Sequence, residues 1–177
     1  MLEGLLVDLV PYGRRFMEND HRWSNGPAIF WSSMGRRDIV TKAQIEAEHR
    51  EWRESTRPET GVAFGVQTKD GKPLGYFGLN FVSYHDRVAN LGANISEPDY
   101  WGGGYGTDAL LLLVDYAFDT LDMRRLFLIT MTLNERVLRQ MEKVGFLLEG
   151  RLRNESRDPS GQIRDTLVFA LIPEDYA

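Results

Sequence analysis

Ten residues near the middle of the chain have the composition of a binding loop. The segment 100–109 reads YWGGGYGTDA, with glycine at four of the five positions from 102 to 106. Glycine allows positive φ angles and close backbone approach, and a helix that starts behind such a turn directs unpaired N–H groups at an anion. A glycine-rich turn is also a common strand-to-helix connector. The segment predicts either a phosphate cradle or a plain loop, and its surroundings must decide between them.

Composition narrows the chemistry that the chain can perform. With 177 residues, 42% of them hydrophobic, one domain spanning 1–177 is expected. The absence of cysteine excludes disulfides and thiolate metal sites, and His21, His49 and His85 are too far apart for a zinc-type cluster, so no metal is predicted. The net charge of -5 disfavours nucleic acid as a partner and suits a cationic one.

The first ten residues do not resemble a targeting segment. Glu3 and Asp8 interrupt a short apolar run, which lacks the basic start of a signal peptide and the length of a membrane span. We therefore expect a soluble, cytoplasmic protein with no membrane partner.

The pattern before the glycine loop predicts helices followed by antiparallel strands. Thr41 precedes Gln44 by three residues, the spacing of a capping box, and Val62, Phe64 and Val66 alternate as in a strand. The expected elements are a strand at 2–10, a helix between Pro11 and Asn25, a loop or broken helix at 28–38, a helix at 41–55, a strand from Gly61, a hairpin turn at 69–72, and strands at 74–83 and 88–95.

The pattern behind the loop predicts a helix first. Apolar residues recur at three- and four-residue steps from 110 to 121, and Asn134 stands at an N-cap position before a helix at 137–144 that Gly145 ends. A buried strand is expected at 124–133, and a closing hairpin at 146–152 and 163–172 around the turn 158–161. The order of elements indicates a mixed α/β (α+β) sheet rather than a doubly wound one.

Four motifs give the chain a family resemblance. They are DYWGGGYGTDAL at 99–110, NERVLR at 134–139, EKVGF at 142–146 and EGRLR at 149–153, and together they span roughly half of the chain. In this order the motifs resemble the GNAT superfamily of N-acetyltransferases, and most of all its RimJ/RimL-like branch. The resemblance implies a central, mostly antiparallel, splayed sheet flanked by helices. The first 60 residues match only in outline, and in such families that region shapes the acceptor site.

The resemblance also implies a role for each motif. Backbone N–H groups of the glycine loop would hold the pyrophosphate of acetyl-CoA, and the end of the preceding strand would pair with the pantetheine arm. Asn134 would bond the pantetheine or serve as a plain N-cap, and Lys143 would reach the ribose phosphate or adenine or remain solvated. Trp101 and Tyr105 are expected to form walls of the site and to pack there rather than to take part in the chemistry. The cofactor-binding candidates are Asn94, Ile95, Ser96, Trp101, Gly102, Gly103, Gly104, Tyr105, Gly106, Thr107, Asn134 and Lys143.

Two positions depart from the family pattern. Met141 stands where related enzymes commonly carry a tyrosine that protonates the leaving thiolate, and Asn90 stands where a glutamate is frequent. Glu97 and the turn Tyr84-His85-Asp86 are the candidates for a replacement base, and for each of them a solvated surface role is the favoured interpretation. The candidate catalytic residues are therefore Asn134 and Glu97.

The sequence thus predicts acetyl transfer from acetyl-CoA to a primary amine by direct attack in a ternary complex. A cysteine-acyl intermediate is excluded because the chain has no cysteine. The acceptor is either a protein α-amino group or a small amine such as a polyamine, amino sugar or antibiotic. The alternative is a catalytically weak or silent CoA-binding module; a Walker-type nucleotide site is a poor third because no Gly-Lys-Ser/Thr follows the glycines. The apolar N-terminal third and the final hairpin suggest a homodimer.

Overall fold

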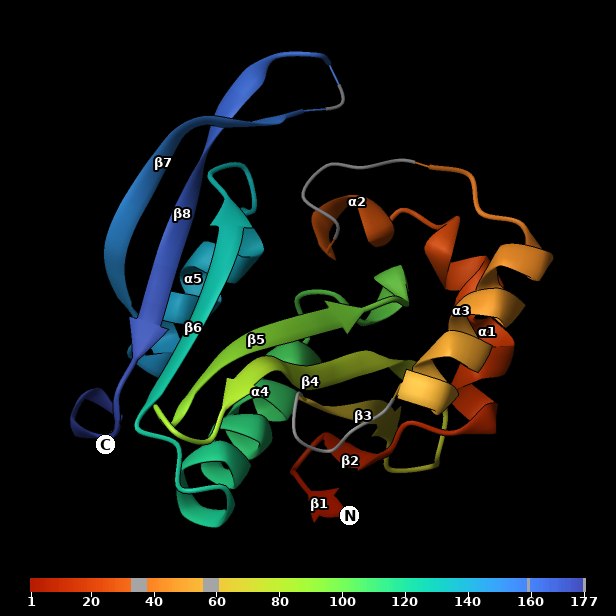
Figure 1. The fold of residues 1–177 in the computed structure, drawn as a ribbon, viewed down its shortest axis with the longest axis horizontal. Helices are drawn as coiled ribbons and strands as arrows, with labels where there is room; N and C mark the ends of the chain where they lie inside the picture. Colours follow the sequence, from red (N-terminus) through yellow and green to blue (C-terminus); the bar gives the residue numbers. More distant parts are fainter. Residues whose placement is uncertain (33–37, 56–60, 159, 177) are drawn as a thin grey trace.

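Eight strands form one sheet in the part of the chain that the computed structural model describes, which is residues 1–177 without 33–37, 56–60, 159 and 177. The strands pair in the order β1-β2-β3-β4-β5-β6-β8-β7 (Figure 1). None of the helices in these ranges is long and apolar enough to cross a membrane. The strands are β1 (Leu2–Glu3), β2 (Val7–Pro11), β3 (Gly61–Thr68), β4 (Pro73–Ser83), β5 (Val88–Ile95), β6 (Arg125–Met131), β7 (Leu147–Arg157) and β8 (Ile163–Leu171).

All neighbouring strands are antiparallel except β5 and β6. These two run parallel through three pairs only, from Val88 opposite Arg125 to Asn90 opposite Phe127. At the last pair the side-chain amide of Asn90 donates to the carbonyl of Phe127 over 3.3 Å. Beyond it the two strands diverge (Figure 1). The mostly antiparallel, splayed sheet expected from the family resemblance is therefore confirmed.

The helices cover both faces of the sheet. A Cβ on Gly65 would overlap the ring of Phe16, so α1 packs closely on β3, whereas the adjacent Phe64 contacts Tyr116 behind α4 in an edge-on ring pair at 5.2 Å. Adjacent residues of a strand point to opposite faces, so α1 and α4 lie on opposite sides. The helices are α1 (Arg14–Ser24), α2 (Ile29–Ser32), α3 (Lys42–Ser55), α4 (Tyr105–Asp115) and α5 (Glu135–Val144), with a π-helical turn at Tyr116–Thr120 and 3₁₀ turns at Pro98–Tyr100 and Pro173–Asp175.

Several local predictions are confirmed by side-chain geometry. Thr41 and Gln44 form the predicted capping box at α3, because the Thr41 N–H donates to Gln44 Oε1 over 2.8 Å and the Gln44 N–H donates to Thr41 Oγ1 over 3.3 Å. Gly71, with φ +87°, makes the predicted turn between β3 and β4. The segment predicted as a loop or broken helix at 28–38 contains the short helix α2; residues 33–37 lie outside the described part.

Two strand predictions were wrong in extent. The strand expected at 2–10 is two strands, β1 and β2, because the Gly4 N–H donates to the Val7 carbonyl over 2.8 Å and closes a turn between them. The final hairpin is longer than expected, since β7 continues to Arg157. At its turn the Asp158 carboxylate accepts from the hydroxyl and N–H of Ser160 and from Arg164, and these bonds lower the pKa of Asp158 to about 2.

Candidate functional site

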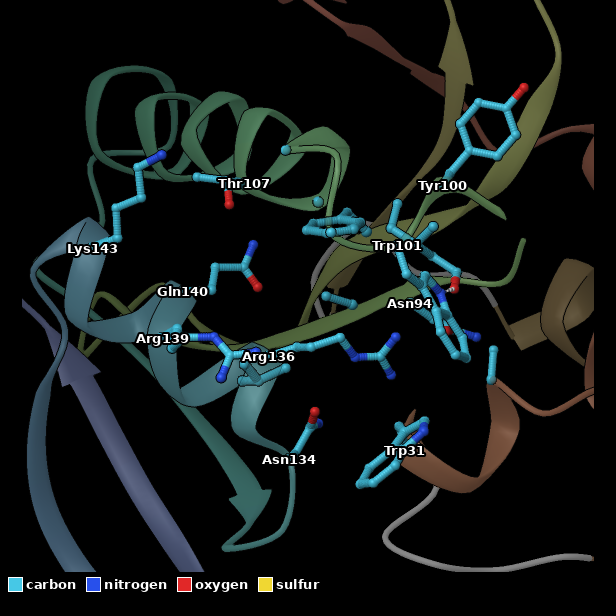
Figure 2. A pocket seen from close by; sticks show the side chains of 18 residues that line it. Trp31, Asn94, Tyr100, Trp101, Thr107, Asn134, Arg136, Arg139, Gln140 and Lys143 are labelled. Atoms are coloured by element: carbon cyan, nitrogen blue, oxygen red, sulfur yellow. Dashed lines mark hydrogen bonds between the residues drawn. The ribbon is translucent and has the colours of Figure 1, made fainter. Parts of the chain in front are cut away.

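A cavity of about 360 Å³ lies at the splay, between the end of β5, the glycine loop, α5 and α2. Gly102 and Gly104 have φ angles of +80° and +90°, the left-handed conformation that favours glycine. Gly104 is the N-cap of α4, so the N–H groups of the first turn, which have no partner inside the helix, begin at this point. Figure 2 shows Thr107 of this turn at the cavity. The loop thus has the geometry of an anion cradle.

One face of α5 supplies positive charge to the same cavity. Arg136, Arg139, Gln140 and Lys143 stand at positions i, i+3, i+4 and i+7 of the helix, which share a face, and line the cavity together (Figure 2). No aspartate, glutamate or histidine occurs among the described lining residues. The cavity therefore favours an anionic ligand. In the described ranges no group of three or more histidine, aspartate or glutamate side chains is placed to hold a metal ion.

Gln140 carries an unused hydrogen-bond donor. Its Nε2 atom is buried without a partner among the described residues, and it would stand 3.7 Å from a Cβ on Gly106. A buried amide donor without an acceptor is costly, so a ligand oxygen between α4 and α5 would relieve it. The glycine cradle, the cations and this donor together fit a phosphate-bearing, polar ligand.

Arg136 lies on the α2 side of the cavity. Its guanidinium carbon lies 3.7 Å from the ring centroid of Trp101 and 5.7 Å from that of Trp31. Burial lowers the pKa of Arg136 below its ordinary value, and the neighbouring Arg139 contributes to the shift. Trp101 is held in turn by a bond of 2.7 Å from its Nε1 to the carbonyl of Ile95. The two indoles therefore define this mouth of the cavity.

The open edge of β5 differs in detail from the prediction. The Ser96 N–H donates to the Leu74 carbonyl of the β4 side over 2.7 Å, and Ser96 is only 4% exposed. Because backbone groups alternate between the two neighbours of a strand, Asn94 and Ser96 turn theirs to β4, whereas Ala93 and Ile95 turn theirs to the gap beside β6. The strand edge that an extended ligand can pair with is thus Ala93 and the N–H of Ile95, because the Ile95 carbonyl already accepts from Trp101.

Glu97 is occupied by structural contacts. Its carboxylate accepts from the guanidinium of Arg22 and, over 2.8 Å, from the indole N–H of Trp23. The bond from Arg22 lowers the pKa of Glu97 below its ordinary value. Such a carboxylate is a weak base, and Glu97 does not belong to the described lining of the cavity. Its contacts tie α1 to the segment that leads into the glycine loop.

Asn134 is placed at the cavity but does not cap its helix with its side chain. It stands at the N-cap position of α5, is 5% exposed, and donates from Nδ2 to Thr130 Oγ1 over 3.2 Å. Thr130 belongs to β6, so this bond joins the start of α5 to the strand across the gap. Asn134 therefore presents a polar group at the splay from a fixed position.

The two positions that depart from the family pattern have structural roles. Met141 is 2% exposed and packs in the core, and it does not belong to the described lining of the cavity. Asn90 holds the last β5–β6 pair. The turn that carries Tyr84, His85 and Asp86 precedes β5, and so lies a strand length of roughly 25 Å from the glycine loop.

The structure brings most of the predicted residues together. Those that line the cavity are Asn94, Ile95, Trp101, Gly102, Gly104, Gly106, Thr107, Asn134 and Lys143; Ser96, Glu97, Gly103 and Tyr105 lie outside its described lining. The sequence reasoning missed Ala28, Trp31, Phe77, Ala93, Tyr100, Arg136, Val137, Arg139 and Gln140. Helical spacing counted back from Lys143 would have found the α5 residues, because 136, 139, 140 and 143 share a face.

Comparison with known proteins assigns the chain to a family. Residues 14–147 match the family model described as an acetyltransferase (GNAT) domain, which is more than half of the chain. The chain therefore belongs to the GNAT acetyltransferases, in the RimJ/RimL-type branch, and is an acetyl-CoA-dependent N-acetyltransferase. The family resemblance found in the sequence is confirmed.

Individual relatives are similar over most of the chain. Spermidine N(1)-acetyltransferase from Escherichia coli (strain K12) is 33% identical over 172 residues, which cover 96% of this chain and 88% of that protein. "Putative ribosomal N-acetyltransferase YdaF" from Bacillus subtilis (strain 168) is 27% identical over 126 residues, 71% of this chain and 67% of that protein. The fold matches the crystal structure of spermidine N-acetyltransferase from Vibrio cholerae in complex with CoA and spermine, with a TM-score of 0.83, 19% identity and coverage of 96% and 97% of the two chains.

Proposed function

We propose that this enzyme transfers the acetyl group of acetyl-CoA to a primary amine of a small polyamine such as spermidine or spermine. The observation that carries the proposal is the cavity at the splay, which joins a glycine cradle to three cations and contains no carboxylate in its described lining. These features suit the phosphates of coenzyme A. The polyamine acceptor is supported by the similarity to spermidine N(1)-acetyltransferase over 96% of the chain.

In this proposal the protein acts by holding two reactants in contact. Backbone N–H groups of the glycine loop and of the first turn of α4 bind the pyrophosphate, while Ala93 and the N–H of Ile95 pair with the pantetheine arm. Asn134 orients the thioester end. The amine enters from the side of α2, past Trp31 and Trp101. Attack of its nitrogen forms the C–N bond and breaks the C–S bond; the nitrogen loses a proton and coenzyme A leaves as a thiolate. Positioning of this kind supplies a large share of the rate.

The described cavity lining offers no general base. A polyamine is mostly protonated at neutral pH, since a free alkyl amine has a pKa of about 10. The acceptor must therefore react as its neutral fraction, with solvent taking the proton. The enzyme is accordingly expected to be slow at neutral pH.

An amine panel tests the proposal. The purified protein is incubated with acetyl-CoA and, separately, spermidine, spermine, an aminoglycoside or a peptide with a free N-terminus, and the released thiol is followed. We expect the largest kcat/KM with a polyamine. A peptide that outperforms spermidine would replace the proposed acceptor with a protein α-amino group, as the similarity to YdaF suggests. Binding of coenzyme A without acetylation of any amine would favour the silent binding module.

The predicted homodimer remains a proposal. The β7–β8 hairpin carries exposed apolar side chains, which support it: Leu147, Leu148, Leu152 and Ile163 are all between 41% and 57% exposed. Light scattering at micromolar concentration measures the mass, and a monomer mass would remove the idea. A cytoplasmic location likewise stays a prediction.

A further inference from the structure

Asp108 connects the start of α4 to the turn between β1 and β2. Its Oδ1 accepts from the N–H of Leu5 over 3.2 Å, and its Oδ2 accepts from those of Leu6 and Val7 over 2.8 Å and 3.0 Å. Three successive N–H groups thus surround one carboxylate, as in the backbone nests that bind anions. Residues separated by about a hundred positions in the sequence are thereby joined next to the glycine loop.

The turn is fixed from two further directions. A Cβ on Gly4 would stand 2.5 Å from Asp108 Oδ2 and 2.8 Å from the Val7 carbonyl oxygen, so glycine is required for this close approach. On its other side, Lys69 Nζ donates to the Gly4 carbonyl over 3.0 Å and pairs with Asp8. The segment 4–7 is therefore a rigid part of the fold rather than a loose end.

The same turn touches the cradle itself. Leu6 Cδ1 lies 3.3 Å from the position that a Cβ on Gly104 would occupy, and Gly104 is the left-handed N-cap of α4. The turn held by Asp108 thus supports the residue whose conformation directs the N–H groups of the cradle. A change at the turn is transmitted to the loop by direct packing.

Because Asp108 is negatively charged, its removal could either strengthen or weaken coenzyme A binding, and the direction of the change reveals its role. A carboxylate in the first turn of α4 repels a phosphate bound at that helix end, so an electrostatic role alone predicts tighter coenzyme A binding after its removal. The three N–H donors hold the carboxylate against the turn. We infer that Asp108 is a positioning residue, which fixes the glycine loop for coenzyme A through the turn 4–7. The inference rests on the proposed binding of coenzyme A at this loop.

Calorimetry of the full chain with coenzyme A tests the inference. In Asp108→Asn the amide oxygen keeps one acceptor, but the amide nitrogen replaces the other and faces a backbone donor, so the turn loses at least one bond and the charge that strengthens the rest. We expect the dissociation constant to rise about tenfold, which equals ~1.4 kcal/mol. The KM for acetyl-CoA should rise by the same factor while kcat and the KM for the amine stay unchanged. A purely structural role would lower the melting temperature and leave coenzyme A affinity, measured well below it, unaltered.

Two matched variants complete the experiment. Asp115→Asn removes the same charge from α4 but disrupts only the bond from the Tyr176 hydroxyl, and should leave the affinity unchanged. Leu6→Ala removes the contact with Gly104 without touching Asp108 and should weaken binding about threefold. Unchanged or tighter binding in Asp108→Asn, or unchanged binding in Leu6→Ala if the first variant does not fold, overturns the inference. A wild-type chain that binds no coenzyme A overturns the proposed site itself.

Discussion

The two sides of the cavity are built from different kinds of structure. The side proposed for coenzyme A comes from the stretch 93–143 and consists of the edge of β5, backbone N–H groups of the glycine loop and one face of α5. The side proposed for the amine is assembled from distant segments, with Trp31 from α2 beside Trp101 and Arg136, and with α1 attached through Arg22 and Glu97. The groups proposed to touch the cofactor thus lie close together in the sequence, with the turn 4–7 as their distant support, whereas acceptor choice depends on side chains that only the tertiary fold brings together.

The largest expected effect is that of pH on kcat/KM, which tests whether the side proposed for the amine contains a general base. Because the described lining contains no carboxylate or imidazole, kcat/KM for spermidine should rise about tenfold per pH unit between pH 7 and 9, up to an amine pKa of about 10. The profile is measured by thiol release at saturating acetyl-CoA. A flat profile would show that a base outside the described lining serves this side.

Gly104→Val should break the side proposed for coenzyme A. A β-branched residue at φ +90° is strained, and its side chain would also meet Leu6, so we expect coenzyme A affinity to fall by at least ~2 kcal/mol, or about thirtyfold. The control is Gly161→Val in the β7–β8 turn, where φ is +87° and no atom lies within 4 Å of the added Cβ. Calorimetric affinity that stays at the wild-type value in Gly104→Val would mean that the cradle lies elsewhere.

Met141→Tyr tests whether the side chain at position 141 of α5 faces the core or the cavity. The family pattern would have this tyrosine supply the missing proton donor, but the side chain of Met141 is buried in the core. We therefore expect a loss of ~1–3 kcal/mol in the free energy of unfolding and no gain in turnover. Urea unfolding measures the first, with Met141→Leu as the nearly neutral control. Faster acetylation by the tyrosine variant would place residue 141 at the thioester.

Lys143→Met should change the affinity for coenzyme A least, and it tests which phosphate of the cofactor this lysine contacts. An exposed ion pair contributes less than ~1 kcal/mol, so coenzyme A should bind about threefold more weakly if this lysine pairs with the ribose phosphate. Dephospho-coenzyme A, which lacks that phosphate, should bind wild type and variant equally. Arg153→Met in β7 controls for the loss of one positive charge. An equal loss for both ligands would assign Lys143 to the pyrophosphate or the adenine.

The sequence predicted the cofactor side better than the acceptor side for a physical reason. The glycines at 102–106, the capping box at Thr41 and the stop at Gly145 depend on neighbours in the chain, so their types reveal their conformations. The break between β1 and β2 was missed because it depends on Asp108, a hundred residues away. Glu97 and Met141 could not be placed because a residue type does not show whether its side chain meets an arginine, the core or a cavity.

The short pairing between β5 and β6 bears on the order in which the parts of the chain fold. The sheet consists of two antiparallel blocks, β1–β5 and β6–β8, and the backbone pairing between them is limited to three residue pairs at 88–90 and 125–127. Within the blocks, β3–β4, β4–β5 and β7–β8 are hairpins with local contacts that form early, whereas the β5–β6 junction must await the crossover through α4. We therefore expect docking of the blocks to be the slow step of folding. Asn90→Ala, which removes the side-chain bond to Phe127, should retard that step more than it accelerates unfolding.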